Sequence, residues 1–239
     1  MTVDDFFADF IDGYLASDLD TMSKANRAEG LMYGDVGYPM VLTTLAGIEL
    51  LGVLLLPTTT PVTRRNGRNR FLRFWNDYLA KDFSVYSGFG DLFYGLLRNG
   101  VAHTYTAKHG VYVTKGSGAP LRYDAANRQV TIDSNVFAQD FLSVYRKNVL
   151  PLLSSEDDAG LNAMSMQTHL DELMKLYEED SVVEFQNLKP SQESLENASR
   201  AFDAVKVFNA SPAVGASGPP GGPPAKPLTT NSGLRTPNP

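Results

Sequence analysis

Arg98, Asn99 and His103 are the residues whose types and spacing most clearly favour chemistry. They lie in the stretch FYGLLRNGVAHTY, residues 93–105, within an otherwise apolar and helix-like segment. A histidine titrates near neutral pH and can exchange protons, whereas an arginine offers a planar, permanently charged fork to phosphate oxygens. The arrangement Arg98-Asn99-x-x-x-His103 therefore favours acid–base chemistry at a phosphate group.

The same residues also have a purely structural interpretation. Arg98 could be a solvated arginine whose stem packs on the protein, and His103 could interact with free carbonyls at a helix C-terminus. Residues five apart lie about 140° apart around a regular α-helix, so Arg98 and His103 do not share a face of such a helix. A distortion at Gly100, which tolerates unusual backbone angles, would bring them closer together.

Glu49 is the second unusual residue, because it lies near the centre of the longest apolar run, residues 40–56. This run is slightly shorter than a membrane span, and a charge at its centre argues against insertion, so we expect a buried helix and no membrane. A buried carboxylate is costly unless it is paired. We expect its partner to be Arg98 or a polar group near His103. The alternative is that Glu49 caps a loop or faces solvent at the end of the helix.

Five arginines crowd the segment that follows this apolar run, in a chain whose net charge is −6. The overall charge argues against coating of nucleic acid through bulk attraction, but a local basic patch can bind RNA phosphates. The alternative is a solvated loop and helix start. The candidate RNA-binding residues are Arg64, Arg65, Arg68, Arg70 and Arg73.

Composition excludes several classes of site in this 239-residue chain. There is no cysteine, so disulfides, thiolate zinc sites and cysteine nucleophiles are excluded. We find no His-x-x-x-His spacing, phosphate-binding loop or dinucleotide fingerprint, and we expect neither a metal nor a cofactor. The N-terminus is acidic and does not resemble a secretory signal, which favours a cytoplasmic protein.

Hydrophobic periodicity predicts a mainly α-helical fold. Helices are expected at residues 2–17, 40–56, from 69 onward and through 92–97, with a loop marked by Gly30, Gly34, Gly37 and Pro39. Residues 110–115, 121–125 and 128–133 predict a small antiparallel hairpin or three-stranded sheet. Asp133 or Ser134 should cap the next helix, in which Phe137, Phe141, Val144 and Tyr145 should form one apolar face. Residues 161–180 and 191–208 should form two more amphipathic helices.

These elements predict three regions. Residues 1–153 form a helical bundle decorated by the β-hairpin at about 110–133, and residues 154–209 form an acidic, helical C-terminal extension. Residues 210–239 are rich in proline and glycine and hold few large apolar side chains, so this tail is expected to be disordered.

The motif and its context resemble the HEPN domains, a helical family of nucleotide-binding proteins in higher eukaryotes and prokaryotes. Many HEPN domains are metal-independent endoribonucleases that carry an arginine and a histidine separated by four to six residues. In this chain an apolar helix with an acidic residue (GIELLG) precedes an aromatic helix, which precedes the motif, and a tyrosine follows two residues after His103. The resemblance covers residues 38–153 and does not extend to the C-terminal helices or the tail.

The resemblance implies a catalytic set of Arg98, Asn99, His103 and Tyr105, supported by Glu49. It also implies a homodimer in which the motifs of two protomers face each other and form one composite cleft. The expected substrate is RNA, and the expected setting is a stress, toxin–antitoxin or phage-defence system with an antitoxin or nucleotidyltransferase as partner. The alternative is a non-catalytic helical module that binds a nucleotide or a protein through the same cleft.

Overall fold

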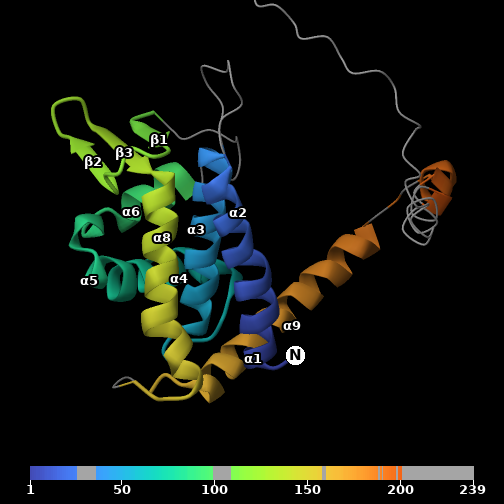
Figure 1. Ribbon diagram of the computed structural model, residues 1–239. Helices are drawn as coiled ribbons and strands as arrows, with labels where there is room; N and C mark the ends of the chain where they lie inside the picture. Colours follow the sequence, from blue (N-terminus) through green and yellow to red (C-terminus); the bar gives the residue numbers. More distant parts are fainter. Residues whose placement is uncertain are drawn as a thin grey trace, which may run out of the picture. The chain divides into compact units, whose positions relative to one another are not determined.

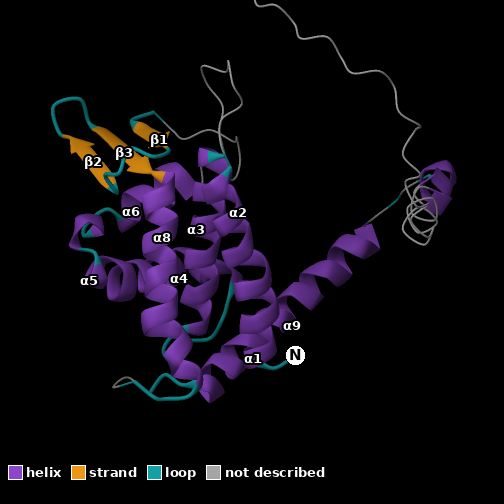
Figure 2. Cartoon of the chain, viewed as in Figure 1, coloured by secondary structure: helices purple, strands orange, loops and turns teal. Residues whose placement is uncertain are grey.

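The computed structural model describes residues 1–25, 36–98, 109–157, 160–187, 189, 191–197 and 199–200. The chain divides into two compact units, Met1–Gln186 and Asn187–Pro239. The first unit is mainly helical with a small three-stranded mixed sheet (Figures 1 and 2). In the second unit residues 192–197 are helical, and the backbone N–H of Ser194 donates to Ser191 Oγ at 3.1 Å. The tail expected from residue 210 lies outside the described residues.

The N-terminal helical stretch is continuous over residues 3–24 and therefore longer than expected. It comprises α1 (Val3–Phe6), η1 (Phe7–Ala16), whose backbone is π-helical, and α2 (Ser17–Lys24). Thr2 caps it through a reciprocal pair of hydrogen bonds with Asp5. The stretch continues past residue 17 because Leu19 is still buried in the core.

Helix α3 (Gly37–Leu54) is the central helix of the first unit, and it packs against α4 and α8. Gly37 and Pro39 were expected in a loop, but they lie in its first turn. A proline is tolerated there because the first N–H groups of a helix have no partner within the helix. Among the described residues α3 is the one helix long and apolar enough to cross a membrane, and 61% of it is buried inside the protein.

Two glycines let neighbouring elements approach α3 closely. A Cβ on Gly47 would lie 2.7 Å from the ring of Phe141, and a Cβ on Gly52 would lie 2.0 Å from the carbonyl oxygen of Arg70. The second contact is with backbone, which cannot move aside as a side chain can. Because Gly52 has no side chain, α3 and the next long helix can cross with their backbones in contact.

That next stretch, residues 67–82, comprises α4 (Gly67–Phe74), the π-helical η3 (Trp75–Leu79) and α5 (Ala80–Asp82). It begins two residues before the expected start at Asn69 and follows a short 3₁₀ turn, η2 (Arg64–Asn66). Trp75 is fully buried, and its Nε1 donates to the carbonyl of Tyr86 at 3.0 Å. Tyr86 belongs to η4 (Ser84–Tyr86), so this bond fixes the turn that follows α5.

The helix that leads to the Arg-Asn-x-x-x-His motif is short. It consists of α6 (Gly90–Leu92) and the π-helical η5 (Phe93–Arg98). Phe93 is fully buried, and its ring centroid lies 4.9 Å from that of Trp75. The expected helix through residues 92–97 is therefore present, and its aromatic anchor holds Arg98 at the edge of the core.

The sheet is mixed, so the expectation of an antiparallel sheet is only partly correct. Its strands are β1 (Val111–Thr114), β2 (Leu121–Asp124) and β3 (Gln129–Asp133), in the order β1-β3-β2. Strands β2 and β3 form the expected antiparallel hairpin, whereas β1 pairs with β3 in parallel. The link between β1 and β2 must therefore cross the end of β3, as Figure 2 shows.

Asp133 holds that crossing in place. Its Oδ2 accepts hydrogen bonds from the backbone N–H and hydroxyl of Ser117 and from the N–H of Gly118. Its Oδ1 accepts from the N–H groups of Asn135 and Val136, which makes Asp133 the expected N-cap of the next helix. Burial alone would raise the pKa of the Asp133 carboxyl, but the hydrogen bonds from Ser117, Val136 and Gly118 outweigh burial and lower it.

The capped helix and the C-terminal helix complete the first unit. α8 (Ser134–Val144) continues as the π-helical η6 (Tyr145–Val149) and the 3₁₀ turn η7 (Leu150–Leu153). Its predicted apolar face, which includes Phe137 and Phe141, is fully buried. α9 (Ala163–Asn187) is longer than the expected 161–180. The first unit extends past residue 153 because Met166 and Leu170 of α9 belong to its core.

Candidate functional site

The structure pairs Glu49 with Arg98, as the sequence predicts. Glu49 lies in α3, and Arg98 is the last residue of η5. Nε and Nη2 of Arg98 lie 3.0 and 2.9 Å from Oε2 of Glu49. The Arg98 side chain also lies over the Tyr94 ring, with Cζ 5.7 Å from the ring centroid. Two donors on one acceptor and a ring beneath the guanidinium fix the orientation of Arg98.

Arg70 is a second cation beside the same carboxylate. Its Nη2 lies 3.5 Å from Oε1 of Glu49, at the limit of a hydrogen bond, and its side chain is only 12% exposed. Its Nε is buried and has no acceptor in the described part of the chain. The three side chains thus combine two positive charges with one negative charge, and Arg70 keeps donor capacity that Glu49 does not use.

Gly67 makes room for this cluster. A Cβ at Gly67 would lie 3.0 Å from Oε1 of Glu49 and 3.2 Å from the hydroxyl oxygen of Tyr94. These separations are tight, and any larger side chain would push into the carboxylate. The first residue of α4 therefore has to be small for Glu49, Arg70 and Arg98 to meet.

The cluster opens into a cavity of about 290 Å³. Helix α3 supplies an apolar wall to it, α4 and η5 supply the two arginines, and Tyr177 reaches it from α9. Its lining is Leu42, Ala46, Glu49, Leu50, Val53, Arg70, Arg98 and Tyr177. Small-ligand sites usually combine a largely apolar wall with a few polar groups. The volume of this cavity is at the lower end of the range for such sites.

The structure separates the five arginines that the sequence grouped together. Arg64 pairs with Asp180 of α9 at 2.6 Å, Arg68 pairs with Asp91, and Arg73 pairs with Asp77 at 2.5 Å. Arg65 is exposed and forms no ion pair with any described residue. Only Arg70 lies with Glu49 and Arg98. The charges of Arg64, Arg68 and Arg73 are thus balanced locally, and RNA binding by this segment stays a prediction.

Three of the predicted catalytic residues, Asn99, His103 and Tyr105, lie outside the described residues. The other two histidines are described. His109 is exposed in the turn before β1, and His169 is buried in α9 with Nδ1 3.3 Å from the carbonyl oxygen of Leu54. In the part of the chain that the structure describes, no group of three or more histidine, aspartate and glutamate side chains is placed to hold a metal ion.

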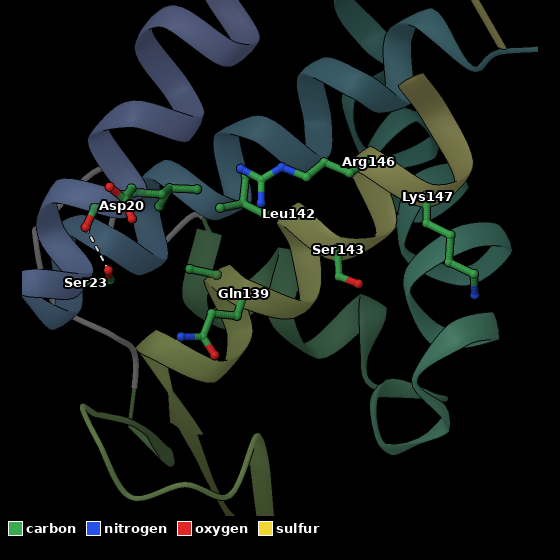
Figure 3. Close-up of a pocket in the computed structure, with 9 residues that line it drawn as sticks. Asp20, Ser23, Gln139, Leu142, Ser143, Arg146 and Lys147 are labelled. Carbon is green, nitrogen blue, oxygen red and sulfur yellow. Dashed lines mark hydrogen bonds between the residues drawn. The ribbon is translucent and has the colours of Figure 1, made fainter. Parts of the chain in front are cut away.

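A larger depression, of about 530 Å³, lies between α2 and α8 (Figure 3). Arg146 extends along it, whereas Lys147 points away and pairs with Asp82 at 3.0 Å. The only hydrogen bond drawn there joins the Ser23 hydroxyl to the backbone carbonyl of Asp20 at 2.7 Å. The nine residues that line it include no histidine. No two arginines share a carboxylate there, as they do at Glu49, and we therefore place the candidate site at the Glu49 cluster.

Comparison of the chain with known protein families, curated proteins and solved structures finds no match. The site therefore has to be interpreted from its own residues. Sequence reasoning missed two residues of the site. It did not predict that Arg70 pairs with Glu49, and it did not predict that Tyr177 lines the cavity. A signal for Arg70 existed in its spacing, since it lies four residues before Phe74, which is fully buried, and residues four apart share a face of a helix. Tyr177 is 128 residues away from Glu49 in the sequence and carried no comparable signal.

Proposed function

We propose that this chain is a metal-independent endoribonuclease of the HEPN type. The observation that carries the proposal is the position of Arg98, the first residue of the Arg-Asn-x-x-x-His motif. Its guanidinium is oriented by Glu49 and lines an open cavity. An arginine whose rotamer is fixed in advance binds a phosphate at a lower cost in side-chain entropy than a free surface arginine does.

In the proposed reaction, the 2′-hydroxyl of a ribose attacks the adjacent phosphorus and the bond to the 5′-oxygen of the next nucleotide breaks. The 2′-hydroxyl loses a proton and the 5′-oxygen gains one. His103 carries one of these two transfers and His103 of the partner subunit carries the other, while Arg98 neutralises charge on the non-bridging phosphate oxygens. Asn99 orients His103 or donates to phosphate, and Tyr105 hydrogen-bonds backbone or substrate. The products are a 2′,3′-cyclic phosphate and a 5′-hydroxyl, and the reaction needs no metal.

The proposal includes a homodimer, because the family's composite cleft takes its arginines and histidines from two protomers. It also includes a cytoplasmic setting in a stress, toxin–antitoxin or phage-defence system, with an antitoxin or nucleotidyltransferase as partner. Light scattering tests the first of these. A dimer at micromolar concentration is expected, and a monomer that cleaves RNA would remove the composite cleft from the mechanism.

A non-catalytic module that binds a nucleotide or protein partner is the second candidate. The observation that favours it is the ion pair itself, because Glu49 already balances the charge of Arg98. In this case Arg98 would serve the architecture of the cavity, and the ligand would bind without being cleaved.

RNA cleavage in the presence of a chelator distinguishes the two candidates. Purified protein should convert single-stranded RNA to products with cyclic phosphate ends. His103→Ala should lower the rate roughly a hundredfold to ten-thousandfold, the usual scale for an acid–base group. Arg98→Ala should also impair cleavage, whereas His109→Ala, which removes an exposed histidine six residues away, should not. Cleavage that needs magnesium, or that survives both substitutions, would contradict the mechanism.

A further inference from the structure

Strand β2 forms one edge of the sheet (Figure 2), and part of its backbone faces outward. Val130 of β3 lies opposite Tyr123, but its N–H donates to the carbonyl of Gly110, on the β1 side of β3. Facing residues of an antiparallel pair alternate between bonded and non-bonded positions, so Tyr123 and Leu121 occupy non-bonded positions. Their N–H and C=O groups therefore point away from the sheet, and they have no hydrogen-bond partner among the described residues.

Tyr123 also leaves an aromatic surface accessible at this edge. It lies opposite Val130, which is buried, and therefore on the side of the sheet that faces the core, yet Tyr123 is 53% exposed. Its ring centroid lies 5.7 Å from that of Phe89, which is only partly buried. Free backbone groups at a sheet edge are a template for pairing with another strand, and such a strand would cover both rings.

The charges on β2 restrict which strand can be added. Arg122 and Asp124 alternate with Tyr123, so they lie on the other face of the sheet. Arg122 is exposed and forms no ion pair with any described residue. In an antiparallel pair, opposite charges on facing residues stabilise the sheet and like charges destabilise it. The added strand must therefore present an acid to Arg122 and a base to Asp124.

The β2 strand of a second copy of the chain meets this requirement. When Tyr123 of one copy lies opposite Tyr123 of the other on a two-fold axis, the outward N–H and C=O groups of the two residues bond reciprocally. Arg122 of each copy then lies opposite Asp124 of the other. The neighbouring register that uses the same outward groups places Leu121 opposite Tyr123, and it would place the two Arg122 side chains opposite each other. The charges therefore favour the register centred on Tyr123.

We propose that the β2 edge binds a second copy of this chain, through antiparallel pairing of the two β2 strands centred on Tyr123. The two sheets then form one continuous sheet across the interface. The residues involved are not those of the composite cleft, so this is a second interface and does not rest on the proposed function. An edge of four residues gives a small contact area, and small interfaces are transient. The pairing should therefore depend strongly on protein concentration.

Cysteine cross-linking tests the pairing, because the chain has no cysteine of its own. The Cα atoms of a bonded antiparallel pair lie about 5.5 Å apart, which is within the span of a disulfide. Tyr123→Cys should therefore form a disulfide-linked dimer under mild oxidation. Tyr112→Cys places the thiol at another exposed tyrosine of the same sheet and should cross-link about tenfold more slowly. Equal rates at the two positions would overturn the pairing.

Reversing the charges tests the register. In the Tyr123→Cys background, Arg122→Asp sets acids opposite each other and Asp124→Arg sets bases opposite each other. Each change should slow cross-linking about tenfold, because it turns the ion pairs on both sides of the axis into like-charge pairs. A mixture of the two variants restores opposite charges between unlike copies, so its cross-linking rate should recover. A mixture that cross-links no faster than its components would overturn the proposal.

Sedimentation of chains that retain Tyr123 guards against an effect of the introduced cysteine. Arg122→Asp should weaken self-association about tenfold. Arg146→Asp makes the same change in charge at an exposed arginine of η6, outside the sheet, and should leave self-association unchanged. An equal loss in the two variants would show that only net charge acts and would overturn the interface.

The result is independent of the proposed function, because neither measurement contains RNA. Failure of the pairing would leave the endoribonuclease mechanism standing. A chain that cross-links at position 123 as expected but cleaves no RNA would contradict the proposed function and support the interface.

Discussion

Asp133 and Glu49 are both carboxylates withdrawn from solvent, and their surroundings differ in the balance of donors and acceptors. Asp133 is fully buried and accepts hydrogen bonds from backbone N–H groups and from one hydroxyl group. These donors belong to four residues, two in the crossing link and two in α8. Glu49 is 16% exposed, accepts from two arginines and leaves one of them with unused donors. All the donors around Asp133 are thus used by the fold, whereas Arg70 beside Glu49 has a buried Nε without an acceptor among the described residues.

The comparison teaches how to distinguish a structural carboxylate from one that belongs to a site. Asp133 is fully buried and Glu49 is mostly buried, and either carboxylate would be costly alone. What separates them is whether the donors around the carboxylate are used up. Because Asp133 faces only neutral donors that it satisfies, its loss should affect stability alone. Because Glu49 competes with any incoming anion for the same arginines, its loss should affect stability and binding in opposite directions.

The largest effect is expected for Asp133→Ala. The change removes the N-cap of α8, worth about 1–2 kcal/mol, and the bonds that hold the crossing link, worth about 1.5–3 kcal/mol for a charged acceptor. The free energy of unfolding in urea should fall by roughly 3 kcal/mol or more. Asp124→Ala is the matched control, since Asp124 accepts from Asn127 and Ala126, two exposed residues of the turn between β2 and β3. A larger loss in the control would contradict the role given to Asp133.

Glu49→Gln should have an intermediate effect on stability and the opposite effect on binding. It leaves two guanidinium groups without their counter-ion, so the free energy of unfolding should fall by about 2 kcal/mol, between the costs for buried and surface pairs. The cavity gains one unit of positive charge, so the affinity for a single-stranded DNA oligonucleotide, which lacks the 2′-hydroxyl and is not cleaved, should rise severalfold. Asp133→Asn should reduce stability without changing this affinity. A fall of this affinity in Glu49→Gln would contradict the competition between Glu49 and the anion.

Lowering the pH should have a smaller effect on the free energy of unfolding. Hydrogen bonding lowers the pKa of Asp133 below its usual value of 3.8, and the unfolded chain keeps that usual value. The stabilisation by Asp133 is therefore fully present above about pH 5 and is lost as the pH falls through the lower pKa of the folded state. The difference in unfolding free energy between the wild type and Asp133→Asn should be constant above pH ~5 and shrink below ~3.8. A difference that grows toward acid would give the opposite sign and contradict this account.

Arg64→Gln should have the smallest effect. Arg64 and its partners Glu179 and Asp180 are all about half exposed, so solvent and salt screen their attraction. The urea midpoint should not change measurably. The same substitution at Arg70, which is mostly buried, should lower it. A loss at Arg64 as large as that at Arg70 would show that the acidic part of α9 is held more firmly than these contacts indicate.

Much of the helical fold could be predicted because burial on one side of a helix leaves a clear pattern. The apolar run around Glu49 and the face formed by Phe137 and Phe141 show that pattern, and both are buried as expected. The N-cap at Asp133 was predictable from its residue type. The pairing of Glu49 with Arg98 was predictable because a carboxylate inside an apolar helix needs a cation.

The remaining features depend on contacts between distant parts of the chain. Alternation within a short strand indicates which face is buried but not which strand lies beside it, so the parallel pairing of β1 with β3 could not be predicted. The bond from Ser117 to Asp133 joins residues 16 apart and depends on that pairing. Arg70 was grouped with its neighbours by charge, and only the crossing of α3 and α4 separates it from them.

That crossing has a consequence for the mutational tolerance of the chain. Gly52 lies one helical turn after Glu49, on the same side of α3, and its missing side chain admits the backbone of Arg70 itself. The acid and its second arginine are therefore brought together by two main chains in contact, not by long side chains that could reach across a gap. Any residue with a side chain at position 52 would separate them. In a library of variants, glycine at position 52 should be as strictly required as the charges that it brings together, although it touches no ligand.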